Sequence, residues 1–365
     1  MLALVLGLLA CNGVGPASTV DSTAAEAPRA PVYTAKITSQ PYHIDKIYPS
    51  MKGPYGFDDV TLSEEAAASP TPELIWIVGY KTKVVDAATG TPMSQEFMCH
   101  ANLDIPTKEY FEDFPTSPSI SGRVFTLSQG QQDIAFPPGM GIPLMSDMKL
   151  SLVTQVLNLN LEQVKMDVKH DVEVFYVKDS ELARPMVPLF QAAAEGFKAL
   201  GDARYYGIAM DQADPAMLGA GCDAGTSASA GDSDDDTLGQ KFTAHWLVQP
   251  GFEENRTNVT RFMNLPYDTK AYYIAVHLHP FAESLELYDL TAKKSVYKGV
   301  VTPSANRIGI EHIDHYESTE GLMLYKDHEY ELISKYNNTS GKDVDSMAVM
   351  YMYLENKTFK KPAIN

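Results

Sequence analysis

Cysteine and positive charge are both scarce in this chain of 365 residues. Three cysteines, at positions 11, 99 and 222, are too few for a disulfide framework, although a bridge from Cys99 to Cys222 is open in an oxidising compartment. Lysine and arginine number 29 against 47 aspartates and glutamates, which gives a formal net charge of −18. This balance argues against nucleic acid or an anionic membrane surface as a partner.

The chain also lacks the short motifs of several large enzyme classes. It has no G-x-S-x-G nucleophile elbow, no phosphate-binding G-x-x-x-x-G-K-[ST] loop, no H-E-x-x-H zinc motif and no paired C-x-x-C set. Its carboxylates are numerous but follow no pattern, so a general acid and base pair has no support.

No apolar run after the first residues approaches the length that spans a bilayer. The opening MLALVLGLLAC is apolar but too short to span, and Leu8 to Cys11 resembles a bacterial lipobox. We therefore expect residues 1–11 to be a signal peptide that ends at a lipidated Cys11, with an ordinary cleaved secretory signal as the alternative. Both predict export to the bacterial cell envelope, on the periplasmic side or facing the outer membrane, with membrane contact only through the lipid. Residues 12–31 have the small, polar composition of a flexible tether.

Short β-rich runs broken by Pro, Gly, Asp and Asn make up the rest of the chain and predict an all-β fold of two tandem antiparallel β-sandwich domains, jelly-roll-like in form. The runs include LIWIVGYKTKVV, EFMCHANLDI, KLSLVTQVLNLNL, HDVEVFYV, FTAHWLVQP, TRFMNL, AYYIAVHLHP, SLELYDL, EYELISKYNN and SMAVMYMYL. We expect an N-terminal domain over 32–205, a linker of acidic and small residues over 206–240, and a C-terminal domain over 241–365. The segment PLFQAAAEGFKALG, 188–201, is expected to be a short helix or loop.

The run AYYIAVHLHP carries His277 and His279, two of only nine histidines. Residues two apart in a strand share one face and lie roughly 7 Å apart, so the two imidazoles are directed to one side. By the same alternation Met347 and Tyr351 share a face of SMAVMYMYL. Imidazole combined with a thioether favours copper, above all Cu(I), over zinc or magnesium.

These residues give the C-terminal domain a resemblance to the ascorbate-dependent type II copper monooxygenases, the family of peptidylglycine alpha-hydroxylating monooxygenase and dopamine beta-monooxygenase. VHLHPFAESLELYDL, followed by KDHEYELISKYNNTSGKDVDSMAVMYMYL, resembles the family's His-x-His strand, its hairpin, and its acidic residue, methionine and tyrosine in register (here Asp345, Met347 and Tyr351). The resemblance implies that His277, His279 and Met347 ligate an oxygen-binding copper and that Tyr351 is catalytic.

The N-terminal half resembles the family less. The family's second copper is held by an adjacent histidine pair and one later histidine, but Cys99 and His100 occupy the place of the pair and Leu157 that of the third ligand. His100 and Cys99 are therefore secondary candidates as ligands of a degenerate copper site. Electrons would come from ascorbate, another external reductant or a redox donor protein. In the peptide-hydroxylating branch an arginine lies two residues before the His-x-His pair, but this chain has Ala275, which argues against a substrate with a carboxyl-terminal glycine.

The favoured function is thus a copper-dependent monooxygenase that oxidises a C–H bond of a small substrate with O2. The alternatives are a non-catalytic copper-handling lipoprotein and a surface interaction module without metal. Each ligand also has a structural interpretation: His277 and His279 as polar residues of a wet pocket, and Met347 as core packing. Packing or surface roles come first for the five other histidines considered, His170, His245, His312, His315 and His328.

Overall fold

The computed structural model of the chain describes residues 30–48, 52–62, 71–118, 122–199, 234–235 and 241–362. Strands make up most of these ranges, so the predicted all-β sandwich fold is confirmed. Cys11, Cys222 and most of the predicted tether and linker lie outside the described residues. No helix of the described ranges is long and apolar enough to cross a membrane.

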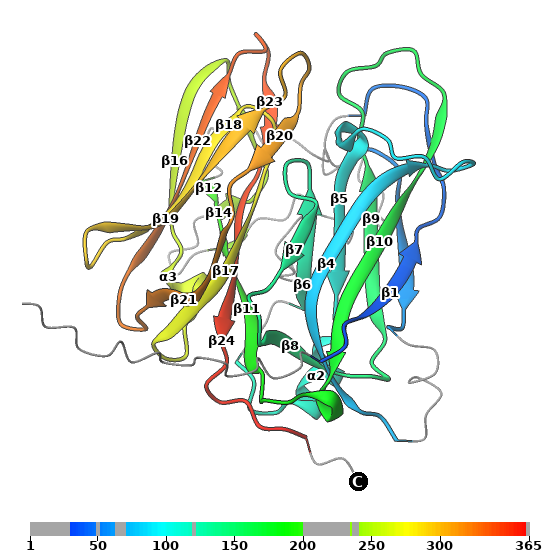
Figure 1. Ribbon diagram of the computed structural model, residues 1–365. Helices are drawn as coiled ribbons and strands as arrows, with labels where there is room; N and C mark the ends of the chain where they lie inside the picture. Colours follow the sequence, from blue (N-terminus) through cyan, green and yellow to red (C-terminus); the bar gives the residue numbers. More distant parts are fainter. Residues whose placement is uncertain are drawn as a thin grey trace, which may run out of the picture.

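The first half of the chain forms a sandwich in which β1, β10 and β4 lie on one side and a sheet of order β3-β9-β5-β6 lies on the other. Figure 1 shows these strands, coloured blue to green, gathered on one side of the molecule. Its strands are β1 (Tyr33–Thr38), β2 (Tyr42–Ile44), β3 (Tyr55–Val60), β4 (Leu74–Asp86), β5 (Met98–Asp104), β6 (Arg123–Ser128), β7 (Asp133–Ala135), β8 (Met140–Met145), β9 (Leu150–Val156) and β10 (Met166–Lys178). Short helical segments are η1 (Gln95–Phe97), α2 (Thr107–Asp113) and η2 (Asp179–Glu181).

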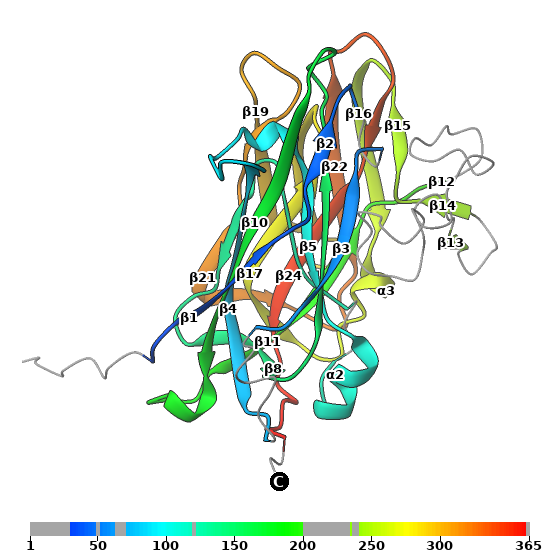
Figure 2. The same cartoon turned by 90° about the vertical axis from the view of Figure 1, so that its right-hand side faces the viewer.

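The second half forms another sandwich, in which β11, β24, β17 and β21 face a sheet of order β16-β22-β18-β19-β20. Figure 2 shows that the strands of both halves run along one long axis. Its strands are β11 (Val187–Glu195), β12 (Lys198–Ala199), β13 (Asp234–Asp235), β14 (Lys241–Thr243), β15 (Trp246–Val248), β16 (Gly251–Asn258), β17 (Thr269–Leu278), β18 (Ala282–Asp289), β19 (Lys294–Pro303), β20 (Ile310–Ile313), β21 (Tyr316–Leu324), β22 (Tyr330–Asn338), β23 (Val344–Ser346) and β24 (Ala348–Glu355).

Strand β11 joins the two halves into one continuous sheet. It pairs in parallel with β8 of the first half and antiparallel with β24 of the second, and green β11 lies beside red β24 in Figure 1. The expectation of a helix or loop over 188–201 is therefore wrong. Three successive alanines favour a helix locally, but pairing on both sides overrides that weak preference. TRFMNL also departs from expectation, because Thr260–Met263 is the short helix α3.

Strands β17 and β24 are buried on both faces, which explains their nearly unbroken apolar sequences. One face, with Val276 and Met350, packs in the core of the second sandwich. The other face, with Tyr273, Tyr351 and Tyr353, packs in the core of the first. Antiparallel pairing sets His277 opposite Val349, on the face directed at the first sandwich.

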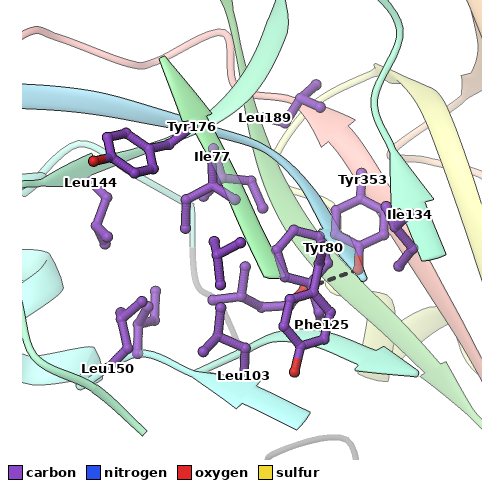
Figure 3. Close-up of a cluster of buried hydrophobic side chains, with 14 of the residues drawn as sticks. Ile77, Tyr80, Leu103, Phe125, Ile134, Leu144, Leu150, Tyr176, Leu189 and Tyr353 are labelled. Atoms are coloured by element: carbon purple, nitrogen blue, oxygen red, sulfur yellow. Dashed lines mark hydrogen bonds between the residues drawn. The ribbon is translucent and has the colours of Figure 1, made fainter. Parts of the chain in front are cut away.

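Two buried tyrosines of the first core differ in their hydrogen bonding. The hydroxyl of Tyr353 donates to the carbonyl oxygen of Val124 at 2.9 Å and so links β24 to β6. Tyr80 has no hydrogen-bond partner for its buried hydroxyl among the described residues. Both rings contact the same cluster, where Phe125 stacks on Tyr80 at 5.1 Å and lies 5.7 Å from Tyr353 (Figure 3).

Replacing these hydroxyls by hydrogen should have different effects. Tyr353→Phe removes a buried hydrogen bond and should lower the free energy of unfolding by about 1 to 3 kcal/mol. Tyr80→Phe, the matched control, should leave that free energy unchanged or raise it, since it removes a buried hydroxyl without a partner. Urea unfolding of both variants measures the difference. Equal losses in the two variants would contradict the assigned role of Tyr353.

Candidate metal centre

His277 and His279 lie at the end of β17, at the seam between the two sandwiches. Their ring centres are 5.4 Å apart with the planes nearly perpendicular, at 87°. Both are buried, with exposed fractions of 3% and 4%. The period of two along a strand therefore brings the predicted pair together as expected.

One ring nitrogen of each histidine is held by a neighbouring side chain. His277 Nδ1 lies 3.0 Å from Ser128 Oγ on β6, and His279 Nδ1 lies 2.8 Å from Asp345 Oδ2 on β23. In the described residues the buried Nε2 of His277 has no hydrogen-bond partner. Histidines that bind metals are typically fixed in this way, with one nitrogen on a protein group and the other on the metal.

The electrostatic surroundings of the two imidazoles differ. Burial, and then the neighbouring imidazoles of His279 and His100, hold the pKa of His277 well below its ordinary value. Burial also acts to lower the pKa of His279, but the charge of Asp345 and its hydrogen bond raise that pKa above the ordinary value overall. His277 is consequently neutral near pH 7, and a neutral imidazole is the form that binds metals.

Met347 lies between β23 and β24, on the same face as Val349, which is paired with His277. It is completely buried, and the hydroxyl of Tyr336 donates to its carbonyl oxygen at 2.6 Å. Tyr351 is also completely buried and is paired with Ala275, two residues before His277. The predicted methionine and tyrosine thus share one face with the histidine pair, as their spacing indicated.

Cys99 and His100 reach the same seam from the first half. Both are buried on β5, and the pairing of β5 with β9 shifts register at Cys99. Such a bulge re-aims side chains and is common beside functional sites. Both residues affect the histidine pair electrostatically: His100 lowers the pKa of His277, and Cys99 contributes to raising the pKa of His279. Leu157, at the third ligand position of the family's second site, is buried in the apolar core of the first half.

Two further buried histidines, for which the sequence favours packing roles, are electrostatically coupled to these residues. The ring of His245, which precedes β15, is 6.3 Å from the ring of His279. Burial, and then His279, lower the pKa of His245 to about 4. His170 on β10 is completely buried, and burial followed by the charge of His100 lowers its pKa to about 3. Only the pairing of strands distant in sequence could have revealed either residue.

In the part of the chain that the structure describes, no three His, Cys, Asp or Glu side chains are grouped closely enough to hold a metal ion. Any site at the seam therefore needs a ligand of another type or a small movement of a side chain. Of the other histidines considered, His312 is exposed, His328 pairs with Asp289 at 2.7 Å, and the ring of His315 stacks on Tyr273 at 5.3 Å.

The turn after His279 carries backbone strain. Phe281 has a φ of 73°, in the left-handed region that bulky residues rarely adopt. The amide of Ala282 donates to the carbonyl oxygen of His279 at 3.3 Å and closes the turn. Strain of this kind, of order 1 to 3 kcal/mol, persists where the surroundings fix the backbone and is concentrated at functional sites.

A separate apolar cavity of about 580 Å³ lies on the first half, between β4, β7, β10 and the segment before β11. Phe136, Met140 and Phe175 line it, with Arg184 as its charged residue. It shares no residue with the histidine cluster.

No family model matches the chain, and no curated protein matches it either. Among solved structures, PNGase F, a glycosylasparaginase from Flavobacterium meningosepticum, is 10% identical, with 91% of this chain and 99% of that chain covered and a TM-score of 0.33. The major capsid protein P2 of bacteriophage PM2 is 7% identical, with 88% and 98% covered and a TM-score of 0.31. Similarity this low carries no argument about function.

The buried histidines predict acid-sensitive stability. Below a pKa near 6.5 the unfolded chain takes up a proton at His170, whereas the folded chain does so only near pH 3. Stability is therefore lost as the pH falls from about 6.5, by up to about 1.4 kcal/mol per pH unit for this residue. Urea unfolding of metal-free His170→Gln should show a flatter decline between pH 6.5 and 4 than the parent chain. A decline in His170→Gln that runs parallel to that of the parent chain would refute the assignment.

Proposed function

We propose that the protein binds one copper ion through His277, His279 and Met347 and uses it for monooxygenase chemistry on a C–H bond of a small substrate. The observation that carries the proposal is the pair of buried imidazoles, each fixed through Nδ1 by a different side chain, Ser128 or Asp345. Met347 shares their strand face.

The residues present fit copper. A buried ring nitrogen without a hydrogen bond, such as Nε2 of His277, costs about 1 to 3 kcal/mol, which a bound metal ion would offset. Among the described residues no three His, Cys, Asp or Glu side chains are grouped, and Met347 offers a thioether on the face of the pair. A set of two imidazoles and one thioether is soft and suits copper better than zinc, magnesium or calcium.

Copper in such a set supplies one-electron chemistry toward O2. Ser128 and Asp345 would keep each imidazole in one tautomer and orientation. Tyr336 holds the backbone of Met347 through its hydrogen bond. Tyr351 places a phenol on the face of the histidine pair, and we assign it to the substrate side of the site. Ascorbate, another external reductant or a redox donor protein would provide the electrons.

Burial favours a second candidate, a copper-handling protein without catalysis. Every proposed ligand is no more than 4% exposed, whereas a substrate needs access to the metal. In both cases we place the protein in the bacterial envelope, anchored through Cys11.

Copper content tests the proposal directly. After loading with Cu(II) and desalting, the protein should retain about one copper per chain by elemental analysis. His277→Ala and His279→Ala should lose it, because each removes half of the imidazole donors. Met347→Leu should keep Cu(II) but lose Cu(I) to a chromophoric Cu(I) chelator at lower chelator concentration, because the soft donor is gone.

Controls separate this site from adventitious copper. His312→Ala removes an exposed histidine and should leave the content at one. Two coppers per chain, one of them lost in His100→Ala, would instead indicate a working site in the first half. Ascorbate-driven O2 consumption that depends on His277 would favour the oxidoreductase, and tight Cu(I) binding without O2 consumption the copper-handling protein. A copper content that His277→Ala does not change would refute both.

A further inference from the structure

We propose that His245 is a third imidazole ligand of this centre, so that the donors come from three adjacent strand segments. The inference rests on the proposed copper site and adds to it a residue that local sequence patterns do not indicate.

Strand pairing places His245 in one row with Met347 and His279. On one side of the methionine, Trp246 pairs with Ser346 and Leu247 with Asp345, so the antiparallel register leads from His245 to Met347. On the other side, Leu278 pairs with Ala348 and His277 with Val349, so the register leads from His279 to the same methionine. Neighbours across paired strands have Cβ atoms about 4.5 to 5.5 Å apart.

The backbone of His245 is held at this place, and its ring has a nitrogen donor to offer. The residue is 4% exposed, and among the described residues its Nε2 has no hydrogen-bond partner. Its backbone is fixed by Thr243, whose hydroxyl donates to the carbonyl oxygen of His245 at 2.9 Å and accepts from its amide at 3.2 Å. The following residue, Trp246, is completely buried.

Ring distances show how much adjustment a shared metal requires. At a metal–nitrogen distance of about 2.0 to 2.1 Å, two imidazoles on one ion have ring centres about 5.2 Å apart in tetrahedral geometry and about 6.4 Å apart in linear geometry. The 5.4 Å between His277 and His279 already falls near the tetrahedral value. The 6.3 Å between His245 and His279 requires the His245 ring to move inward by about 1 Å for a tetrahedral site.

This small gap agrees with the lack of a ready group of three His, Cys, Asp or Glu in the described ranges. It also indicates which ligand moves. Ser128 and Asp345 hold the rings of His277 and His279, whereas the hydrogen bonds of His245 in that part of the chain are made by its backbone. Binding would therefore draw in His245 and leave the other two in place.

A set of three imidazoles and one thioether has a distinct chemical consequence. Imidazole suits both oxidation states of copper, while the thioether favours Cu(I). The third imidazole should therefore chiefly strengthen Cu(II) binding, and the ion would stay bound when it is oxidised.

The test compares His245→Gln and His245→Leu with the parent chain, all loaded with Cu(II). X-ray absorption should give three imidazoles per copper in the parent and two in each variant. Competition against a Cu(II) chelator should show Kd raised at least ~10-fold, since loss of mere supporting groups around a metal costs 10 to 100-fold. His312→Gln is the matched control and should behave as the parent, and metal-free thermal unfolding confirms that each variant folds.

The outcomes separate this inference from the proposed site. If copper is lost in His277→Ala but Kd is unchanged in both His245 variants, the copper site stands and the third ligand is refuted. If the parent binds no copper, both fail. Should neither His245 variant fold, the imidazole count of the parent decides, with two imidazoles overturning the inference and three supporting it.

Discussion

The structure depends on the burial of β17 and β24 from both sides. Each strand gives alternate side chains to two different cores, so a single residue shift in register would exchange the two sets. Their pairing is therefore strongly specified, and with it the positions of every residue on the face directed at the first sandwich. This constraint places His277 and Met347, because the register of the two strands decides which side chains lie on that face.

Burying the histidines has an energetic cost. Of the nine histidines in the chain, His100, His170, His245, His277 and His279 are buried, and all five lie within electrostatic reach of another member of the set. Imidazoles buried in an apolar interface lose hydration, and ring nitrogens without partners lower stability further. A sequence selected for stability alone would place apolar residues there. Binding at the proposed copper site would offset part of this cost.

The local sequence was sufficient to predict which side chains share a face within a single strand. Alternation within VHLHP and SMAVMYMYL placed each set of side chains on one face, and the structure confirms both placements. The strand conformation of β11 could not be predicted, because its three alanines favour a helix locally and only pairing with β8 and β24 makes it a strand. The position of His245 beside His279 could not be predicted for a related reason: its neighbour Trp246 contacts Ser346, 100 residues away in the sequence, and no periodicity indicates that pairing.

The strands around the centre are not equally constrained. Among the described strands β17 and β24 belong to the large sheet and are covered on both faces, whereas β15 pairs only with the three residues of β23. A two-stranded ladder of this length is marginal alone and depends on the packing of Trp246 against its neighbours. The proposed centre would thus have His277 and His279 on strongly constrained strands and His245 beside a short ladder. Trp246 and Val248 of β15 belong to the second core, so any movement of β15 that admitted an ion to the proposed centre would be coupled to the packing of that core.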